Sequence, residues 1–230
     1  MVDYLVSSKK GSILAIDADP NSTLPEALGI KSCDSIAGIC DDVLKHVDSI
    51  PAGMTKERFI EMRVQEAIAE EKGFDLLVMG RPEGPGCYCY VNNLLRDLMA
   101  RVIKNYDFVV IDNAAGMEHI SRRTMRNIDR LLIISDYSVI GMRSAKRISE
   151  LVKELGIKVG SASLVVNKAS GFLEPLQDEI RATGVKFIGA IPFDASVEDW
   201  SISSKPIFAF ESITIKDKIR EIFSDLMGQK

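Results

Sequence analysis

The sequence predicts an α/β fold with three layers built around a mostly parallel sheet. Short apolar runs alternate along the chain with segments whose apolar residues recur at helical spacing, which is the pattern of βαβ units. The 230 residues are 46% apolar and 27% charged, enough to form one sizeable core. Because no linker rich in Pro, Gly or Ser interrupts the pattern, we expect a single domain over residues 1–230.

The first residues are expected to form the tail of a helix, and six strands follow it. Val2, Leu5 and Val6 share helical spacing. Residues 9–11, two lysines and a glycine, are typical of a helix end. Each strand is expected where a short apolar run is bounded by polar or turn residues. These runs are Ile13–Ile16, Leu76–Met79, Phe108–Ile111, Leu131–Ile134, Ser163–Val166 and Phe187–Ile191.

Three further segments have apolar residues at helical spacing, and we expect their apolar faces to pack on the sheet. Their apolar residues are Val91, Leu94, Leu95, Leu98, Met99 and Val102 in the first, Ala145, Ile148, Leu151 and Val152 in the second, and Ile219, Ile222, Phe223 and Leu226 in the third.

The charge balance argues against two classes of partner. A formal net charge of -4 and a pI near 5.4 give no basic surface for nucleic acid or for anionic lipid. The sequence has no run of 18 uncharged apolar residues, and its first residues lack the order of a signal peptide. We therefore expect a cytoplasmic protein that binds neither nucleic acid nor membrane.

Two carboxylates follow the first expected strand, at Asp17 and Asp19. The carboxyl ends of parallel strands are where α/β sheets collect ligands. A carboxylate at Asp19 is suited to orient or deprotonate an attacking water. The structural alternative is a plain Asp-Pro turn at residues 19–20.

A third acid, Asp112, ends the strand at Phe108–Ile111, and a turn of small residues leads from it to Gly116. The arrangement resembles a Walker B aspartate that holds Mg²⁺ through water, with a glycine able to approach a γ-phosphate. A strand followed by its turn is the alternative interpretation.

Polar residues at the ends of two later strands suit an adenine. Asn167 has an amide with one donor group and one acceptor. Guanine-specific proteins of similar layout place an acid where this chain has Ser170, so adenine is favoured. Pro192 is expected to pack on the purine face, and Asp194 to lie near its amino edge. The alternatives are an Asn-Lys turn and a proline that simply ends a strand.

The four cysteines are not expected to form structural disulfides in a reducing compartment. Cys33 and Cys40 are interpreted as small buried apolar side chains, with metal ligation as the alternative. Cys87 and Cys89 form a Cys-Tyr-Cys pair after a Gly-Pro-Gly turn, and in an extended segment both sulfurs project to one face. Since a structural tetrahedral site takes four ligands, a second copy of the chain would have to complete it. Burial is the alternative here too.

The two histidines receive no functional assignment. His46 has no expected partner, and His119 is expected to be an exposed residue at a helix start, with contact to a bound partner as the alternative.

Five segments together, DADP, GRPEGPGCYCY, VVIDNAAGMEH, VVNK and IPFD, resemble the CooC-type accessory ATPases of carbon monoxide dehydrogenase maturation. These proteins belong to the MinD/ParA group of deviant Walker A P-loop proteins, and the resemblance covers nearly the whole chain. It implies a P-loop NTPase-like fold and an ATP-dependent homodimer that uses ATP/ADP and Mg²⁺. It also implies that carbon monoxide dehydrogenase is the client and nickel the metal supplied.

The resemblance assigns a role to each matching position. Four thiolates from two chains admit tetrahedral Zn²⁺ or square-planar Ni²⁺, so the ligands alone do not identify the ion. The implied roles are catalytic residues in switch I for Asp17 and Asp19, the Walker B acid for Asp112, the adenine site for Asn167, Pro192 and Asp194, and the shared metal ligands for Cys87 and Cys89.

The sequence departs from this group in one respect. Its members begin with a strand and a KGGxGKT phosphate loop, and no such motif occurs here; the lysines and glycine of residues 9–11 follow a helix instead. We expect that roughly 25 residues, a first strand, the phosphate loop and most of a helix, are missing from the printed sequence. Because that strand is central in the group, two unpaired strand edges are expected.

Two other functions remain as alternatives. One is an iron–sulfur electron-transfer ATPase like the nitrogenase iron protein, but that family takes a second cysteine from after the Walker B strand, and all four cysteines here precede residue 90. The other is a MinD/ParA-like positioning ATPase, which would have a basic amphipathic tail. The amphipathic segment at residues 216–227 mixes both charge signs on its polar face.

Overall fold

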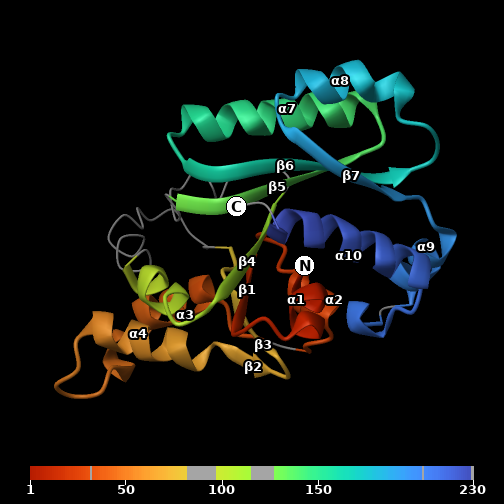
Figure 1. Cartoon of the computed structure of the whole chain (residues 1–230). Coiled ribbons are helices and arrows are strands. Elements are labelled where there is room, and N and C mark those ends of the chain that lie inside the picture. Colours follow the sequence, from red (N-terminus) through yellow and green to blue (C-terminus); the bar gives the residue numbers. More distant parts are fainter. Residues whose placement is uncertain (32, 82–96, 115–126, 204, 229–230) are drawn as a thin grey trace. The chain divides into compact units, whose positions relative to one another are not determined.

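The computed structural model describes the chain apart from residues 32, 82–96, 115–126, 204 and 229–230 (Figure 1). It divides into two compact units, Met1–Thr124 with Lys205–Ala209, and Met125–Ser204 with Phe210–Lys230. Each unit is described by itself. The expected single domain over residues 1–230 concerns how the two units are joined, and it stays a prediction.

The first unit is built on a four-stranded sheet of order β2-β3-β1-β4. The strands are β1 (Ile13–Ala18), β2 (Ala69–Glu71), β3 (Phe74–Val78) and β4 (Phe108–Asn113). β1 lies between β3 and β4 and is parallel to both, and all six of its residues are buried. β2 is antiparallel to β3 across a tight turn in which Gly73 has a φ of 96°. This hairpin was not predicted from the sequence.

Helices of the first unit begin and end where side chains and turns dictate. α1 (Val2–Ser8) ends at Lys9, which takes a left-handed conformation, close to the predicted end. Ser35 and Thr55 cap two helices by accepting backbone N–H groups three residues on. The elements are α1, α2 (Leu24–Leu28), α3 (Ile36–Lys45), η1 (Val47–Ser49), α4 (Lys56–Glu66) and the returning turn η3 (Ile207–Ala209).

Apolar side chains of α3, α4 and the helical residues 97–103 pack with the sheet into one core. Leu98, Met99 and Val102 are buried, as their spacing predicts. The other members of that predicted stripe, Val91, Leu94 and Leu95, lie outside the described residues. Phe208 of η3 stacks on Phe74 with ring centroids 5.6 Å apart, which fixes the returning segment to β3.

The second unit is built on a parallel three-stranded sheet of order β5-β6-β7. Figure 1 shows α7 and α8 on one face of this sheet and α10 on the other. Ile222, Phe223 and Leu226 of α10 are buried, as predicted from their spacing. The elements are β5 (Asn127–Asp136), α7 (Val139–Glu154), β6 (Lys158–Ala169), η2 (Glu174–Leu176), α8 (Gln177–Ala182), β7 (Lys186–Pro192), α9 (Ala195–Ile202) and α10 (Ile213–Gly228).

The fold is therefore α/β with mostly parallel sheets, as predicted. All six expected strands are present, and most extend a few residues beyond their apolar runs. In the described part of the chain, β4 pairs with β1 alone and β5 with β6 alone, so each is an edge strand of its sheet. Within the described ranges, none of the helices has both the length and the apolar character needed to span a bilayer.

Candidate functional site

Three carboxylates gather at the carboxyl end of the first unit's sheet. Asp17 on β1 and Asp112 on β4 are directly opposite each other in the parallel register, and Asp19 follows two residues after Asp17. Partial burial raises the pKa of Asp112 above its usual range, and the negative charges of Asp17 and Asp19 raise it further. The predicted meeting of strand-end acids therefore occurs, and it leaves an excess of negative charge at this edge.

Asp17 is fully buried, and its carboxylate holds the loop that follows β1. One oxygen accepts the backbone N–H of Asp19 at 2.9 Å, and the other accepts the N–H of Leu24, the first residue of α2, also at 2.9 Å. Charged acceptors make strong hydrogen bonds to backbone donors, so this one side chain fixes both ends of the loop. Its position indicates that Asp17 holds the loop, whereas the sequence interpretation placed it with Asp19 as a catalytic residue.

Asp19 is half-buried, and its own contacts shape the tip of the same loop. Its Oδ1 accepts the N–H of Asn21 at 2.8 Å, and its backbone oxygen accepts the N–H of Ser22 at 3.0 Å. This is an Asx turn, the structural alternative weighed for Asp19, and it leaves Oδ2 without a hydrogen bond in the described part of the chain. The turn and a water-orienting role are compatible.

The segment that contains the cysteine pair begins at this edge. After β3, the N–H of Met79 donates to the backbone oxygen of Asp17 at 2.8 Å, and the oxygen of Met79 accepts from Ala37 on α3 at 3.0 Å. Gly80 follows with a φ of +69°, and a Cβ there would lie 2.5 Å from the Ser35 side chain. The chain therefore leaves β3 along a fixed path.

Several predicted site residues lie outside the described residues: Cys87, Cys89, Gly116 and His119. In the ranges that the structure does describe, no group of three or more His, Cys, Asp or Glu side chains is placed to hold a metal ion.

The predicted adenine residues lie at the carboxyl end of the second sheet. Asn167 is half-buried, and its Oδ1 accepts the N–H of Lys168 at 3.0 Å, which leaves the amide NH₂ to donate. Lys168 has a φ of 54°, a left-handed conformation that is uncommon for lysine. The N–H of Phe193 donates to Ala169 at 2.9 Å and ties the ends of β6 and β7 together.

Asp194 follows Pro192, the exposed last residue of β7, and its carboxylate is already occupied. Oδ1 accepts the N–H of Ser196 at 2.8 Å and its hydroxyl at 2.6 Å, and Oδ2 accepts the hydroxyl of Ser212 at 3.2 Å. The hydrogen bonds from Ser196, with a smaller contribution from Ser212, lower the pKa of Asp194. Asp194 caps α9, and it has little capacity left for a base.

Sequence reasoning missed Asp136, a further acid at a strand end. Asp136 ends β5 opposite Asn167 in the parallel register, and its Oδ1 accepts the hydroxyl of Ser138 at 3.0 Å. A Cβ added at Gly141 would lie 1.8 Å from that oxygen, so a side chain there would displace the Asp136 carboxylate. The available signal was the run Leu-Leu-Ile-Ile-Ser-Asp, which has the same form as the other strand ends.

Two expectations about single residues need correction. His46 does have a partner, because its Nδ1 lies 3.0 Å from Oδ1 of Asp42, one helical turn away on α3. Cys40 is buried as predicted, and burial raises its pKa to about 11. Cys33 is only partly buried, since it lies in the loop before α3 and not in a regular element.

Comparison with known proteins relates the chain to nucleotide-binding proteins. A family model described as an AAA domain matches residues 1–162. An uncharacterized ATP-binding protein of Methanocaldococcus jannaschii is 41% identical over 98% of this chain and 90% of its own length. The carbon monoxide dehydrogenase accessory protein CooC of Rhodospirillum rubrum is 25% identical over 86% of this chain and 79% of its own length.

Solved structures with the same fold include three of the MinD/ParA type. MinD in the MinC:MinD complex of Aquifex aeolicus superposes with a TM-score of 0.71 at 19% identity, covering 100% of this chain and 88% of that one. A ParA family ATPase of Chlorobium tepidum gives 0.68 at 18% identity over 99% and 90%. MinD of Pyrococcus horikoshii, complexed with Mg-ADP, gives 0.66 at 13% identity over 99% and 88%. These similarities confirm the predicted fold class.

Proposed function

The chain belongs to the AAA-domain family, and on this premise we propose that it is an ATP-dependent metallochaperone that holds a metal ion between two copies of itself and supplies nickel to carbon monoxide dehydrogenase. The support from relatives is a 41% identical ATP-binding protein and the 25% identical accessory protein CooC. The observation that carries the proposal is the cluster of Asp17, Asp19 and Asp112 at the end of two neighbouring parallel strands.

The nucleotide half of the proposal uses this cluster. The raised pKa of Asp112 marks a place where negative charge is in excess, and a bound cation would offset that charge. Carboxylate oxygens and water are the ligands that Mg²⁺ prefers, so Asp112 fits a Mg²⁺ ion bound through water. When bound with ATP, that ion would neutralise phosphate charge. Asp19 would orient the attacking water, and Asp17 would hold Asp19 in place through the loop.

Asn167 and Pro192 are the residues proposed to bind the adenine base. The free amide NH₂ of Asn167 can donate to a ring nitrogen of adenine, and the exposed Pro192 offers a flat apolar surface for the purine. Asp194 would contribute through α9, whose first turn it caps beside Pro192.

The metal is the cargo, and Cys87 and Cys89 would bind it. Two such pairs from a homodimer provide four thiolates, suited to Ni²⁺ or Zn²⁺. The hydrogen bond from Met79 to Asp17 joins the strand that leads to these cysteines with the residue that holds the switch loop. If nucleotide binding moves this loop, metal affinity changes with it, and linkage requires the metal to change nucleotide affinity by the same factor.

The test is metal content with and without ATP. The double variant Cys87→Ala/Cys89→Ala should lose bound nickel or zinc, measured as metal per dimer by elemental analysis, while Cys33→Ala, at a partly exposed cysteine outside the pair, should keep it. ATP should change the metal affinity of the unmodified chain. Undiminished metal in the double variant would exclude Cys87 and Cys89 as ligands.

A positioning ATPase is the second candidate, and the MinD and ParA structures favour it. On α10, Lys218 pairs with Glu221 at 2.8 Å and Arg220 with Asp217 at 3.0 Å, so opposite charges offset each other on its polar face. Such a face attracts anionic lipid weakly. Sedimentation with anionic vesicles and with DNA distinguishes the two functions, since a positioning ATPase would bind one of these surfaces when loaded with ATP.

A further inference from the structure

The first unit contains an open cavity of about 520 Å³, with several charged and hydroxyl side chains in its lining, that no step of the proposed function uses. Its wall is one face of α3, from the capping Ser35 to His46, and it is completed by Ser22 of the loop after β1 and by Gly80 and Arg81 after β3. A volume of this size is typical of sites for small molecules. The chemistry of the lining indicates which class of molecule would fit.

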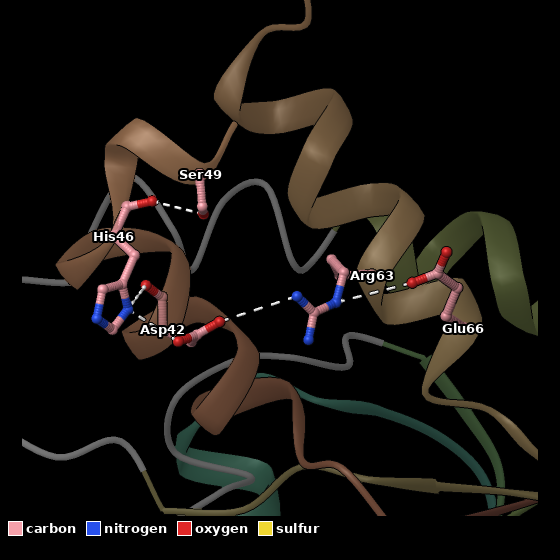
Figure 2. Close-up of polar contacts among 5 residues, drawn as sticks. All are labelled: Asp42, His46, Ser49, Arg63 and Glu66. Atoms are coloured by element: carbon pink, nitrogen blue, oxygen red, sulfur yellow. Dashed lines mark hydrogen bonds and ion pairs between the residues drawn. The ribbon is translucent and has the colours of Figure 1, made fainter. Parts of the chain in front are cut away.

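Both acids that line the cavity already interact with other residues of the chain. Asp42 lies between His46 and Arg63, with Oδ1 3.0 Å from Nδ1 of His46 and Oδ2 3.8 Å from Nη1 of Arg63 (Figure 2). Arg63 in turn lies 3.7 Å from Glu66 on the same helix. Asp41 is 8% exposed and has an interaction partner of its own. Neither carboxylate is free to bind a cation in the cavity.

The two cationic side chains in the lining, in contrast, are available to pair with a ligand. Lys45 and Arg81 are exposed, and neither makes an ion pair in the part of the chain that the structure describes. The hydroxyl of Ser35 accepts the N–H of Gly38 at 3.1 Å, which leaves its O–H free to donate. The groups left available to a ligand are therefore two positive charges and a hydroxyl donor.

We propose that this cavity binds a small molecule with two anionic groups, either phosphate or carboxylate. Arg81 is suited to hold one group with paired N–H donors, and Lys45 to hold the other as a point charge. The α3 N-terminus is not the source of the site, because the N–H groups of Ala37 and Gly38 already donate to Met79 and Ser35. Since Ser22 lines the cavity, the bound anion touches the loop that Asp17 and Asp19 shape.

The test is calorimetric titration of the full chain with pyrophosphate, which carries two phosphate groups, and, separately, with citrate, in buffer that contains neither metal nor nucleotide. At least one anion should bind saturably. Lys45→Gln/Arg81→Gln should weaken that binding at least tenfold, whereas Lys104→Gln, at an exposed lysine of the same unit that does not line the cavity, should leave it unchanged. The tighter of the two anions identifies the group that the cavity selects.

Three results would overturn the proposal: no saturable binding of either anion, equal binding by the double variant, or equal weakening by Lys104→Gln. Circular dichroism checks that the variants are folded, which is expected because the substituted side chains are exposed. Because the titration uses no metal and no ATP, its outcome is independent of the metallochaperone proposal.

Discussion

The two sheets end in similar residues, but the side chains at their carboxyl ends are in opposite electrostatic states. In the first unit, burial and neighbouring acids raise the pKa of Asp112, so its carboxylate is destabilised where it lies. In the second unit, three hydrogen bonds from Ser196 and Ser212 lower the pKa of Asp194, so its carboxylate is satisfied by the chain itself. An acid at the end of a strand can thus be either destabilised by its surroundings or stabilised by hydrogen bonds from the chain.

The direction of the pKa shift distinguishes acids that favour a bound cation from acids whose hydrogen bonds stabilise the fold. An acid surrounded by other acids is stabilised when a cation binds, whereas an acid that already accepts several hydrogen bonds is stabilised little. On this criterion Asp112 is the stronger candidate for a binding role, and Asp194 has mainly a structural one. Four predictions test the comparison, beginning with the largest expected effect.

Replacing Asp17 by alanine should have the largest effect on stability. The N–H groups of Asp19 and Leu24 would lose their acceptor in a buried place, which costs about 2–5 kcal/mol of the free energy of unfolding. Urea denaturation measures this loss. The pKa of Asp112 should fall in the same variant, because one neighbouring negative charge is gone. Asp17→Asn, which keeps one acceptor oxygen, should lose less, and a loss below about 1 kcal/mol in the alanine variant would contradict the structural role.

Gly80→Ala should destabilise the exit from β3 by about 2 kcal/mol, since a left-handed backbone and a contact with Ser35 both oppose a side chain there. Gly53→Ala is the matched control, because Gly53 also has a positive φ, of 83°, but no atom lies within 4 Å of the added Cβ. The control should lose about 1 kcal/mol. Equal losses in urea denaturation would show that Ser35 does not fix this exit.

The two acids should show opposite dependence of stability on pH. A raised folded-state pKa means that the folded chain binds the proton more tightly, so the contribution of Asp112 is lost as pH rises through that pKa. For Asp194 the folded-state pKa is lowered, so its contribution is present above the unfolded pKa and is lost as pH falls through the folded one.

Asp112→Asn should therefore be more stable than the parent at neutral pH, and Asp194→Asn less stable. Urea denaturation at each pH should show the Asp112 difference shrinking toward zero as pH falls from neutral through the raised pKa, and the Asp194 difference shrinking only below about pH 4, the ordinary pKa of an aspartate. Asparagine retains an acceptor for the N–H of Ser196, while its NH₂ group replaces the oxygen that accepts from Ser212, so the second variant removes the charge together with that one acceptor. Differences of the same sign would mean that the two sheet ends are electrostatically alike.

The sequence predicted the strands well because each is an apolar run buried in a sheet. β2 was missed because Ala-Glu-Glu has no apolar pattern, and it forms a strand only as the hairpin partner of β3. The pairing of Asp17 with Asp112 followed from a general rule, that parallel strands end at the same edge. For the strands and for this pair of acids, the local sequence pattern correctly predicted the tertiary structure.

The hydrogen-bond and ion-pair partners of the polar side chains could not be predicted in the same way. Ser212 reaches Asp194 across 18 residues, and no local pattern encodes such a contact. The pair of Asp42 and His46 was available from sequence, because residues four apart on a helix are neighbours. The cavity beside α3 depends on the end of β3 and on the loop after β1 together, so it emerges only in the folded unit.

The smallest expected effect lies inside the second sheet, at Ser163 on β6. Its side chain is fully buried, and its hydroxyl has no hydrogen-bond partner in the described structure. A buried hydroxyl without a partner is unfavourable, so Ser163→Ala should leave stability unchanged or raise it by up to about 1 kcal/mol in urea denaturation. Ser149→Ala, at another buried serine of the same unit, is the control. A loss of more than about 1 kcal/mol on Ser163→Ala would mean that this hydroxyl does make a stabilising hydrogen bond, and the core of the second unit would then contain a polar contact as the edge of its sheet does at Asp194.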